Sequence, residues 1–350
     1  MTKDPRWRIV PVDREGAVTR TSGKPATITE VAKHAGVSLS TVSRVMNDNP
    51  TVDPSLAERV RSSALELGYA ASPLARSLVL GRTQTIAVVV PDLGNPTFQA
   101  VLRGLSRAAA ADGYHVLIAD SAEQVAEERL LAVETRRRTD GLILCAPRMP
   151  SDELAALVPL VAPVVLVNRT VDGVPSIAAD YGTALRDLAD HLYELGHRRL
   201  AYLSGVARSA SNAARLAALA GFRADHPEVQ LSELESGVDF DSGAAAADAV
   251  VATGATGILA FNDLVAMGLL SALADRGVRV PHDVSITGFD DIPFARYTSP
   301  PLTTASVPAA ELGTLAWGAM NAVLSGGEAS GAVRLAPEVV LRGSTGVVSG

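Results

Sequence analysis

The sequence has little of what several classes of protein require. Its 350 residues include one cysteine, so neither a disulfide framework nor a cysteine metal cluster is available. Cys145 lies inside an apolar run, where we expect a buried thiol. The longest apolar runs, such as 85–91 and 141–146, are far too short to span a bilayer, and residues 1–26 contain no apolar signal segment. We therefore expect a cytoplasmic protein.

Signatures of common enzyme sites are missing as well. The sequence has no GxSxG or HExxH motif, no Walker A lysine loop and no GxGxxG after its first apolar strand. Its six histidines do not have metal-ligand spacing, and His197 fits a structural role. We expect no catalysis, no cofactor and no metal.

Negative charge dominates the chain but not its N-terminal part. The whole sequence has 31 Lys and Arg against 38 Asp and Glu, whereas residues 1–83 have 12 against 8. A polyanionic partner is therefore expected to meet the N-terminal quarter of the protein.

The N-terminal quarter has the pattern of short helices. Residues 1–26 show no hydrophobic period and are predicted to be a disordered extension. Helices are predicted within 27–70, the third beginning at the N-cap Asp53 and ending at Gly68. Residues 71–84 form a connector.

From residue 85 to 345 the pattern is that of an α/β protein with doubly wound parallel sheets. This length is large for one sheet, so we expect two lobes with a ligand cleft at the carboxyl ends of the strands. The predicted strands are 85–91, 114–119, 141–146, 163–167, 199–204, 256–261 and 284–289, and the predicted helices include 97–112, 123–138, 183–195 and 262–276.

The stretch GVSLSTVSRVMN, residues 36–47, indicates a helix–turn–helix. Gly36 supplies the turn and Ser38 can cap the second helix. The residues spaced to pack the two helices together are Ala32, Ala35, Val37, Val42 and Val45. Those left to face outward are Leu39, Ser40, Ser43, Arg44 and Asn47, which are short except for one arginine able to contact guanine. The alternative is a helical hairpin that packs elsewhere in the protein.

Longer segments resemble the lac/galactose repressor (LacI/GalR) family. TITEVAKHAGVSLSTVSRVMND is similar to the DNA-binding headpiece of that family. The similarity continues in order through GYAASPLARSL, LGHRRLAYLSG and FNDLVAMGLLSALADRGVRVPHDVSITGFDDIPFARYTSPPLTT, and it spans about residues 27–345.

The resemblance implies a sequence-specific regulator of transcription, most simply a repressor. It implies a homodimer on a near-palindromic double-stranded DNA operator, controlled by a small effector bound between two lobes. Carbohydrate is the expected effector class, and a nucleobase or nucleoside is the alternative. A solute-binding protein without DNA activity is the more distant alternative, and whether the effector is an inducer or a corepressor stays open.

The resemblance also assigns the DNA contacts. The resemblance implies that residues 71–84 are a hinge helix and linker, the hinge folding into a helix when two protomers meet on the operator. Leu78 matches the hinge leucine that wedges into the minor groove and kinks the duplex, with Ala75 facing the same groove. The expected DNA-binding residues are Thr29, Ser38, Leu39, Ser40, Thr41, Ser43, Arg44, Asn47, Ala75 and Leu78.

The core resembles two-lobed periplasmic sugar-binding proteins, with chain crossings between the lobes expected near 168, 291 and 325. The expected effector-binding residues are Asn95, Phe98, Arg169, Arg215, Asn262 and Asp290. Asp290 is expected to accept hydrogen bonds from sugar hydroxyls and Arg215 to reach the ligand from the second lobe, while a role in a local salt bridge is the alternative for each of them. Val307 stands where relatives often have glutamine, which makes the effector harder to name.

Overall fold

The computed structural model describes residues 26–46, 51–69, 81–327 and 331–348. The chain divides into two compact units, Met1–Gly81 and Arg82–Gly350. Of the expected DNA contacts, Asn47, Ala75 and Leu78 lie outside the described residues, as does the predicted disordered extension up to residue 25. No helix of the described part is long and apolar enough to cross a membrane.

The N-terminal unit contains three short helices around a small aliphatic core. They are α1 (Ile28–Ala35), α2 (Leu39–Met46) and α3 (Pro54–Glu66). Thr27 and Glu30 form a reciprocal capping box at α1, and Asp53 caps α3 as predicted. The core is formed by Val31, Ala32, Ala35, Val42, Val45, Ala57, Val60 and Ala64. The predicted helix–turn–helix packing is therefore confirmed.

The turn between α1 and α2 depends on Gly36, whose φ is +64°. An added Cβ would meet nothing within 4 Å, so Gly36→Ala would cost only the backbone strain of a left-handed alanine, about 1–2 kcal/mol. We expect about tenfold faster amide hydrogen exchange over α1 and α2 in the full-length variant. Gly221→Ala is the matched control: it lies in a helix with open space around it, so alanine should stabilise by about 0.5–1 kcal/mol. Unchanged exchange in the Gly36 variant would contradict the strain argument.

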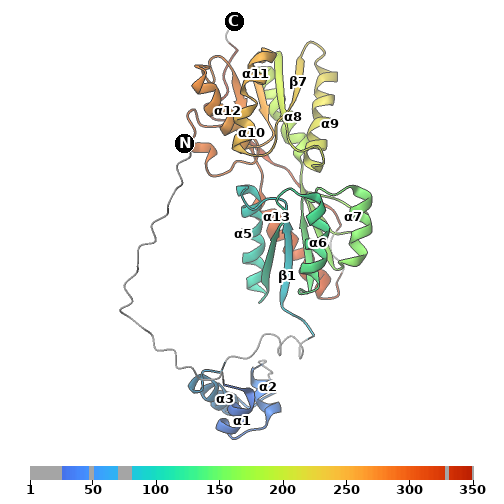
Figure 1. The fold of residues 1–350 in the computed structure, drawn as a ribbon, viewed down its shortest axis with the longest axis vertical. Helices are drawn as coiled ribbons and strands as arrows, with labels where there is room; N and C mark the ends of the chain where they lie inside the picture. Colours follow the sequence, from blue (N-terminus) through green and yellow to red (C-terminus); the bar gives the residue numbers. More distant parts are fainter. Residues whose placement is uncertain (1–25, 47–50, 70–80, 328–330, 349–350) are drawn as a thin grey trace, which may run out of the picture. The chain divides into compact units, whose positions relative to one another are not determined.

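The first lobe of the C-terminal unit is built on a six-stranded parallel sheet with the order β11-β5-β4-β3-β1-β2. Its strands are β1 (Thr85–Val90), β2 (His115–Asp120), β3 (Gly141–Cys145), β4 (Val164–Val167), β5 (Ser176–Ala179) and β11 (Val333–Leu335). Its helices are α5 (Pro96–Ala111), α6 (Val125–Arg136), α7 (Ser151–Leu157) and α13 (Ala309–Leu324). Helices α5 and α13 pack on one face, and α6 and α7 on the other (Figure 1).

The second lobe has a four-stranded parallel sheet with the order β7-β6-β8-β9. Its strands are β6 (Arg199–Ser204), β7 (Gln230–Glu235), β8 (Gly257–Ala260) and β9 (Ser285–Thr287). Helices α8 (Tyr181–Glu194) and α9 (Ala210–Asp225) cover one face. The other face packs against α10 (Phe240–Ala245), α11 (Ala247–Thr253) and α12 (Asp263–Asp275). The expected doubly wound α/β core is confirmed.

The chain passes between the lobes at places that differ from those expected. Strand β5 still pairs with β4, so the first crossing lies near residue 180 and not near 168. The second lies at β10 (Thr304–Ser306), not near 291, because Leu302 still belongs to the core of the second lobe. The third lies at β12 (Glu338–Val340), which pairs with β10, and not near 325. The first and third crossings lie later in the chain than expected because the short strands β5 and β11, which still belong to the first lobe, were not recognised in the sequence.

Candidate functional site

The outer face of α2 carries the side chains expected to contact DNA. Val42 and Val45 are 0% and 2% exposed and hold the helix on the unit's core, whereas Leu39 is 48% exposed. Ser40 and Arg44 are also exposed, as is Thr29 on α1. The helix therefore presents short polar side chains and one long cation, and its apolar residues other than Leu39 face inward.

Hydroxyl groups hold the start of α2. The Ser38 Oγ accepts a hydrogen bond from the Thr41 backbone N–H at 3.2 Å, which is the cap predicted from the sequence. It also lies 2.8 Å from the hydroxyl oxygens of both Ser40 and Thr41. These three hydroxyls thus form a local cluster at the N-terminus of α2, where a phosphate oxygen would be attracted.

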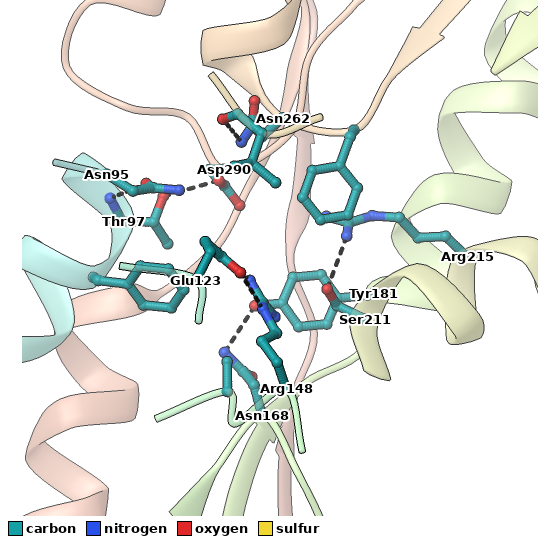
Figure 2. A pocket seen from close by; sticks show the side chains of 14 residues that line it. Asn95, Thr97, Glu123, Arg148, Asn168, Tyr181, Ser211, Arg215, Asn262 and Asp290 are labelled. Atoms are coloured by element: carbon teal, nitrogen blue, oxygen red, sulfur yellow. Dashed lines mark hydrogen bonds and ion pairs between the residues drawn. The ribbon is translucent and has the colours of Figure 1, made fainter. Parts of the chain in front are cut away.

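In the C-terminal unit, side chains from both lobes line one cavity with about 490 Å³ of empty space, part of it open to solvent. Its walls come from the carboxyl ends of strands in both sheets and the first turns of α5, α8 and α9. The lining residues are Asn95, Thr97, Phe98, Glu123, Ala146, Arg148, Asn168, Tyr181, Ser211, Arg215, Val238, Phe261, Asn262 and Asp290 (Figure 2).

Arg215 is more deeply buried than Arg148, the other arginine of this cavity. Its side chain extends from α9, and the residue is 1% exposed. The guanidinium carbon lies 4.6, 4.5 and 4.1 Å from the ring centroids of Tyr181, Phe261 and Phe289. Its Nη1 donates to the Ser211 Oγ at 3.1 Å, whereas the buried Nε has no hydrogen-bond partner. A buried donor without an acceptor is costly, so this group favours a ligand that supplies one.

Asp290 faces the cavity from the loop after β9, with an unusual backbone φ of +105°. Its Oδ2 accepts a hydrogen bond of 2.9 Å from the Thr97 Oγ1, so this contact joins the first lobe to the second. Burial raises the pKa of the Asp290 carboxyl to about 6, although Arg215 and the Thr97 hydroxyl both favour the charged form. Among the described residues, neither Asp290 nor Arg215 forms a salt bridge, which was the alternative to a ligand role.

A partly buried ion pair that was not predicted from the sequence forms another wall. The Arg148 Nε and Nη2 both donate to the Glu123 carboxylate, each at 2.8 Å, in a bidentate arrangement. The Arg148 backbone N–H donates to Glu128 at 2.7 Å, and burial raises the pKa of the Glu128 carboxyl. Glu123 and Arg148 follow β2 and β3, so the rule that ligands bind at strand carboxyl ends was the signal that could have identified them.

Asn168 and Tyr181 link the first lobe to the start of α8. The Asn168 Nδ2 donates to the Tyr181 hydroxyl at 2.9 Å, and its Oδ1 accepts from the Ala179 backbone N–H at 3.0 Å. Burial raises the pKa of the Tyr181 hydroxyl, so it stays neutral and can donate a hydrogen bond into the cavity. Neither residue was singled out from the sequence.

The remaining predicted residues divide between the cavity and its surroundings. Asn95 and Phe98 line it from α5, where the Asn95 Oδ1 also caps the helix through the Thr97 backbone N–H at 2.9 Å. Asn262 lines it too, and its side chain bonds to the backbone at both Val265 and Val238. Asn262 is thus the N-cap of α12.

Arg169 does not line this cavity. Its Nη2 donates to the Met149 carbonyl oxygen at 3.1 Å and to the Ser151 Oγ at 2.9 Å, which directs it to a neighbouring cavity. Val307 is also absent from the lining: it is 7% exposed and packs in the core. Asp263 is buried and accepts from the Thr304 Oγ1 and the Ile292 backbone N–H at 2.6 and 2.8 Å, so it braces the loop that carries Asp290.

Family models match both units of the chain. Residues 27–72 match the model of bacterial regulatory proteins of the lacI family. Residues 189–345 match a periplasmic binding protein-like domain. The first match covers the three-helix unit and the second covers much of the part that contributes Arg215 and Asp290.

Individual relatives align over nearly the whole chain. The HTH-type transcriptional repressor CytR of Escherichia coli K12 is 31% identical over 332 residues, which cover 91% of this chain and 96% of the relative. The ribose operon repressor of the same strain is 32% identical over 302 residues, covering 83% and 91%. The crystal structure of the lac repressor dimer bound to operator and the anti-inducer ONPF is 26% identical, with a TM-score of 0.84 and coverage of 92% of this chain and 100% of that one.

Proposed function

The chain belongs to the lacI family of bacterial regulatory proteins, and we propose that it represses transcription by binding an operator through α2 and releasing or retaining it according to a small effector. The observation that carries this proposal is that one chain combines a helix–turn–helix unit with a cavity lined by both lobes of its core. Operator DNA lies in the cytoplasm, and we place the protein there.

In the DNA-binding unit we assign the sequence-reading role to Arg44. It is exposed near the end of α2, and arginine makes bidentate contacts to the O6 and N7 of guanine. Leu39 is positioned for a thymine methyl, and the cluster of hydroxyls at Ser38, Ser40 and Thr41 for phosphate oxygens. Thr29, Ser43 and, outside the described residues, Asn47, Ala75 and Leu78 complete the proposed interface.

For the effector we favour a sugar. Arg215 offers donors and Asp290 offers a carboxylate oxygen in the lining of the same cavity, and a sugar hydroxyl both donates and accepts hydrogen bonds. The Glu123–Arg148 pair provides acceptors and donors at a further wall. We include Asn95, Phe98, Asn262, Arg215 and Asp290 in the proposed site and leave Arg169 out. The second candidate is a nucleoside, favoured by the aromatic side chains of Phe98, Tyr181 and Phe261 in the lining.

We propose that the effector controls operator binding by changing how the two lobes are arranged. The lac repressor structure to which this chain is similar is a dimer on its operator, and a dimer would present two α2 helices to two half-sites here as well. The effector would change the population that binds DNA only as far as its affinity differs between the lobe arrangements. Contacts that join the lobes, such as Thr97 with Asp290, are therefore where the effector would act.

The proposal is tested by thermal unfolding of the purified protein against sugars, sugar phosphates and nucleosides. A ligand at 100 times its Kd stabilises the folded state by about 2.7 kcal/mol, which shifts the melting temperature measurably. Stabilisation by a neutral sugar supports the first effector class, and stabilisation by nucleosides alone supports the second. A protein that binds no specific DNA in a random-sequence selection would contradict the regulatory function itself.

Effector binding should weaken in acid because of Asp290. Burial raises its pKa to about 6, and a hydroxyl donates a stronger hydrogen bond to the charged carboxylate than to the neutral carboxyl. Below about pH 6 the charged form that binds the effector more tightly is depleted, so the affinity should fall by up to about tenfold per pH unit, while above about pH 7 it should be constant. Thr97→Val removes a hydrogen bond that favours the carboxylate, so the decline should begin at higher pH. Titration calorimetry at several pH values measures this, and an affinity that is unchanged down to about pH 5 would contradict it.

A further inference from the structure

A second cavity lies beside the effector cavity and shares Asn168, Tyr181 and Ser211 with it. It has about 920 Å³ of empty space, part of it open to solvent. Its walls come from the ends of β4 and β5, from β11, and from the first turns of α7, α8 and α9, so both lobes contribute. Two arginines line it, Arg169 and Arg334, and nothing in the proposed effector site uses them.

Arg169 is held in this cavity by bonds that use only part of its guanidinium. Its Nη2 donates to the Met149 carbonyl oxygen and the Ser151 Oγ, which fixes its direction. Partial burial lowers its pKa, and Glu128 is the carboxylate that most favours its charge. That carboxylate is itself occupied by the backbone N–H groups of Arg148 and Met149, at 2.7 and 2.8 Å. The remaining donors of Arg169 are therefore available to a ligand.

Arg334 approaches from the edge strand β11, where it is paired in register with Ala178 of β5. Its side chain is exposed. The carboxylate in the same lining, Asp180, caps α8 through the Thr183 backbone N–H at 3.2 Å and hydroxyl at 3.0 Å. Among the residues that the structure describes, neither Arg169 nor Arg334 forms an ion pair. Two cations thus line one cavity without a carboxylate that neutralises either of them.

We propose that this cavity is a second ligand site, selective for a phosphate group held between Arg169 and Arg334. Guanidinium groups bind phosphate through paired N–H···O bonds, and charge-assisted bonds of this kind are stronger than neutral ones. The anion would supply a counter-charge to the two arginines, with which Asp180, the carboxylate in the described lining, forms no ion pair. The Ser151 and Ser211 hydroxyls in the same lining are further donors to phosphate oxygens. The phosphate is either free inorganic phosphate or the phosphoryl group of a small metabolite.

The second cavity lies beside two of the segments that connect the lobes, so a bound ligand can change how the lobes are arranged. Asp180, at the first crossing between the lobes, donates its backbone N–H to the Leu335 carbonyl oxygen of β11 at 2.7 Å. Leu335 is followed by the third crossing at β12. A phosphate between Arg169 and Arg334 would therefore touch the connections about which the lobes move. This regulatory consequence rests on the proposed function, whereas binding of phosphate does not.

The test is thermal unfolding of the full-length protein in increasing inorganic phosphate, with sodium chloride at matched ionic strength as the reference. We expect the wild type to be stabilised by phosphate relative to chloride. Arg334→Gln and Arg169→Gln should each raise the apparent Kd for phosphate at least about tenfold. Arg223→Gln, which removes the same charge from an exposed position of α9, should leave it unchanged. Arg169→Gln removes two hydrogen bonds and can impair folding. Arg334 is exposed, so Arg334→Gln is expected to fold and keeps the test valid in that case.

The outcomes separate this site from the effector cavity. Asp290→Ala should retain the response to phosphate, because Asp290 does not line the second cavity. Glycerol 3-phosphate distinguishes free phosphate from a phosphorylated metabolite as the natural ligand. If it binds more tightly than inorganic phosphate and its binding depends on Arg334, the ligand is a phosphorylated metabolite. If it binds more weakly, the ligand is free phosphate. No stabilisation of the wild type beyond that in chloride, or equal stabilisation of wild type and Arg334→Gln, would overturn the proposal.

Discussion

Asp290→Ala is expected to raise the Kd for the effector roughly thirtyfold or more, the equivalent of about 2–5 kcal/mol. The substitution removes the acceptor that faces the cavity and leaves the Thr97 hydroxyl without its carboxylate partner. A buried polar group that loses its partner costs its full desolvation penalty. Titration calorimetry with the effector identified by thermal unfolding measures the change directly.

The matched control is Asp291→Asn, which changes the neighbouring carboxylate. Asp291 pairs with Arg342, whose Nη2 lies 2.5 Å from its Oδ1, and it does not line the effector cavity. This variant should therefore unfold at a lower temperature yet bind the effector with unchanged affinity. If Asp291→Asn weakened effector binding as much as Asp290→Ala does, the loss would reflect the loop as a whole, and the assigned role of Asp290 would be wrong.

Arg44→Ala should reduce operator affinity by about 1–3 kcal/mol and relax selectivity at one base pair of each half-site. The reason is geometric: Val42 and Val45 are buried, so α2 can turn only its outer face to the DNA, and Arg44 is the long cation on that face. Binding to operators that carry every base at each position, at fixed salt concentration, measures both effects.

Arg59→Ala is the charge-matched control within the same unit. Arg59 is exposed on α3, so its loss removes one positive charge but no proposed base contact. We expect it to leave the sequence preference intact. If Arg44→Ala lowered affinity equally for all sequences, as loss of a phosphate contact would, the base-reading role of Arg44 would be refuted.

The sequence predicted best those helices and strands whose own hydrophobic spacing determines which side chains are buried. The helix–turn–helix could be predicted because Val42 and Val45 alternate with polar residues at helical spacing and Gly36 marks the turn. The strongly apolar strands β1, β3 and β6 were placed within a residue or two, since both of their faces are buried. Strands β7 and β11 were missed because their mixed polar pattern is that of a sheet edge and not of a buried strand.

Parts of the effector cavity could not be predicted because they depend on side-chain direction. Arg169 and Asn168 are neighbours after β4, yet Asn168 faces the effector cavity and Arg169 turns toward Ser151. Glu123 and Arg148 lie 25 residues apart and become a pair only when β2 and β3 align on either side of β1. Asp290 and Arg215 were predicted through the family resemblance, and the sequence alone did not indicate that three aromatic rings surround the arginine.

The central claim is that an effector in the cavity controls operator binding. The most direct test measures the Kd for operator with and without the effector, in the wild type and in Asp290→Ala. We predict that the effector changes the wild-type Kd for operator by a factor set by its preference for one lobe arrangement, commonly five- to 150-fold or about 1–3 kcal/mol. Asp290→Ala should bind the operator normally but no longer respond to the effector. An effector that binds in the cavity and leaves wild-type operator affinity unchanged would contradict the account.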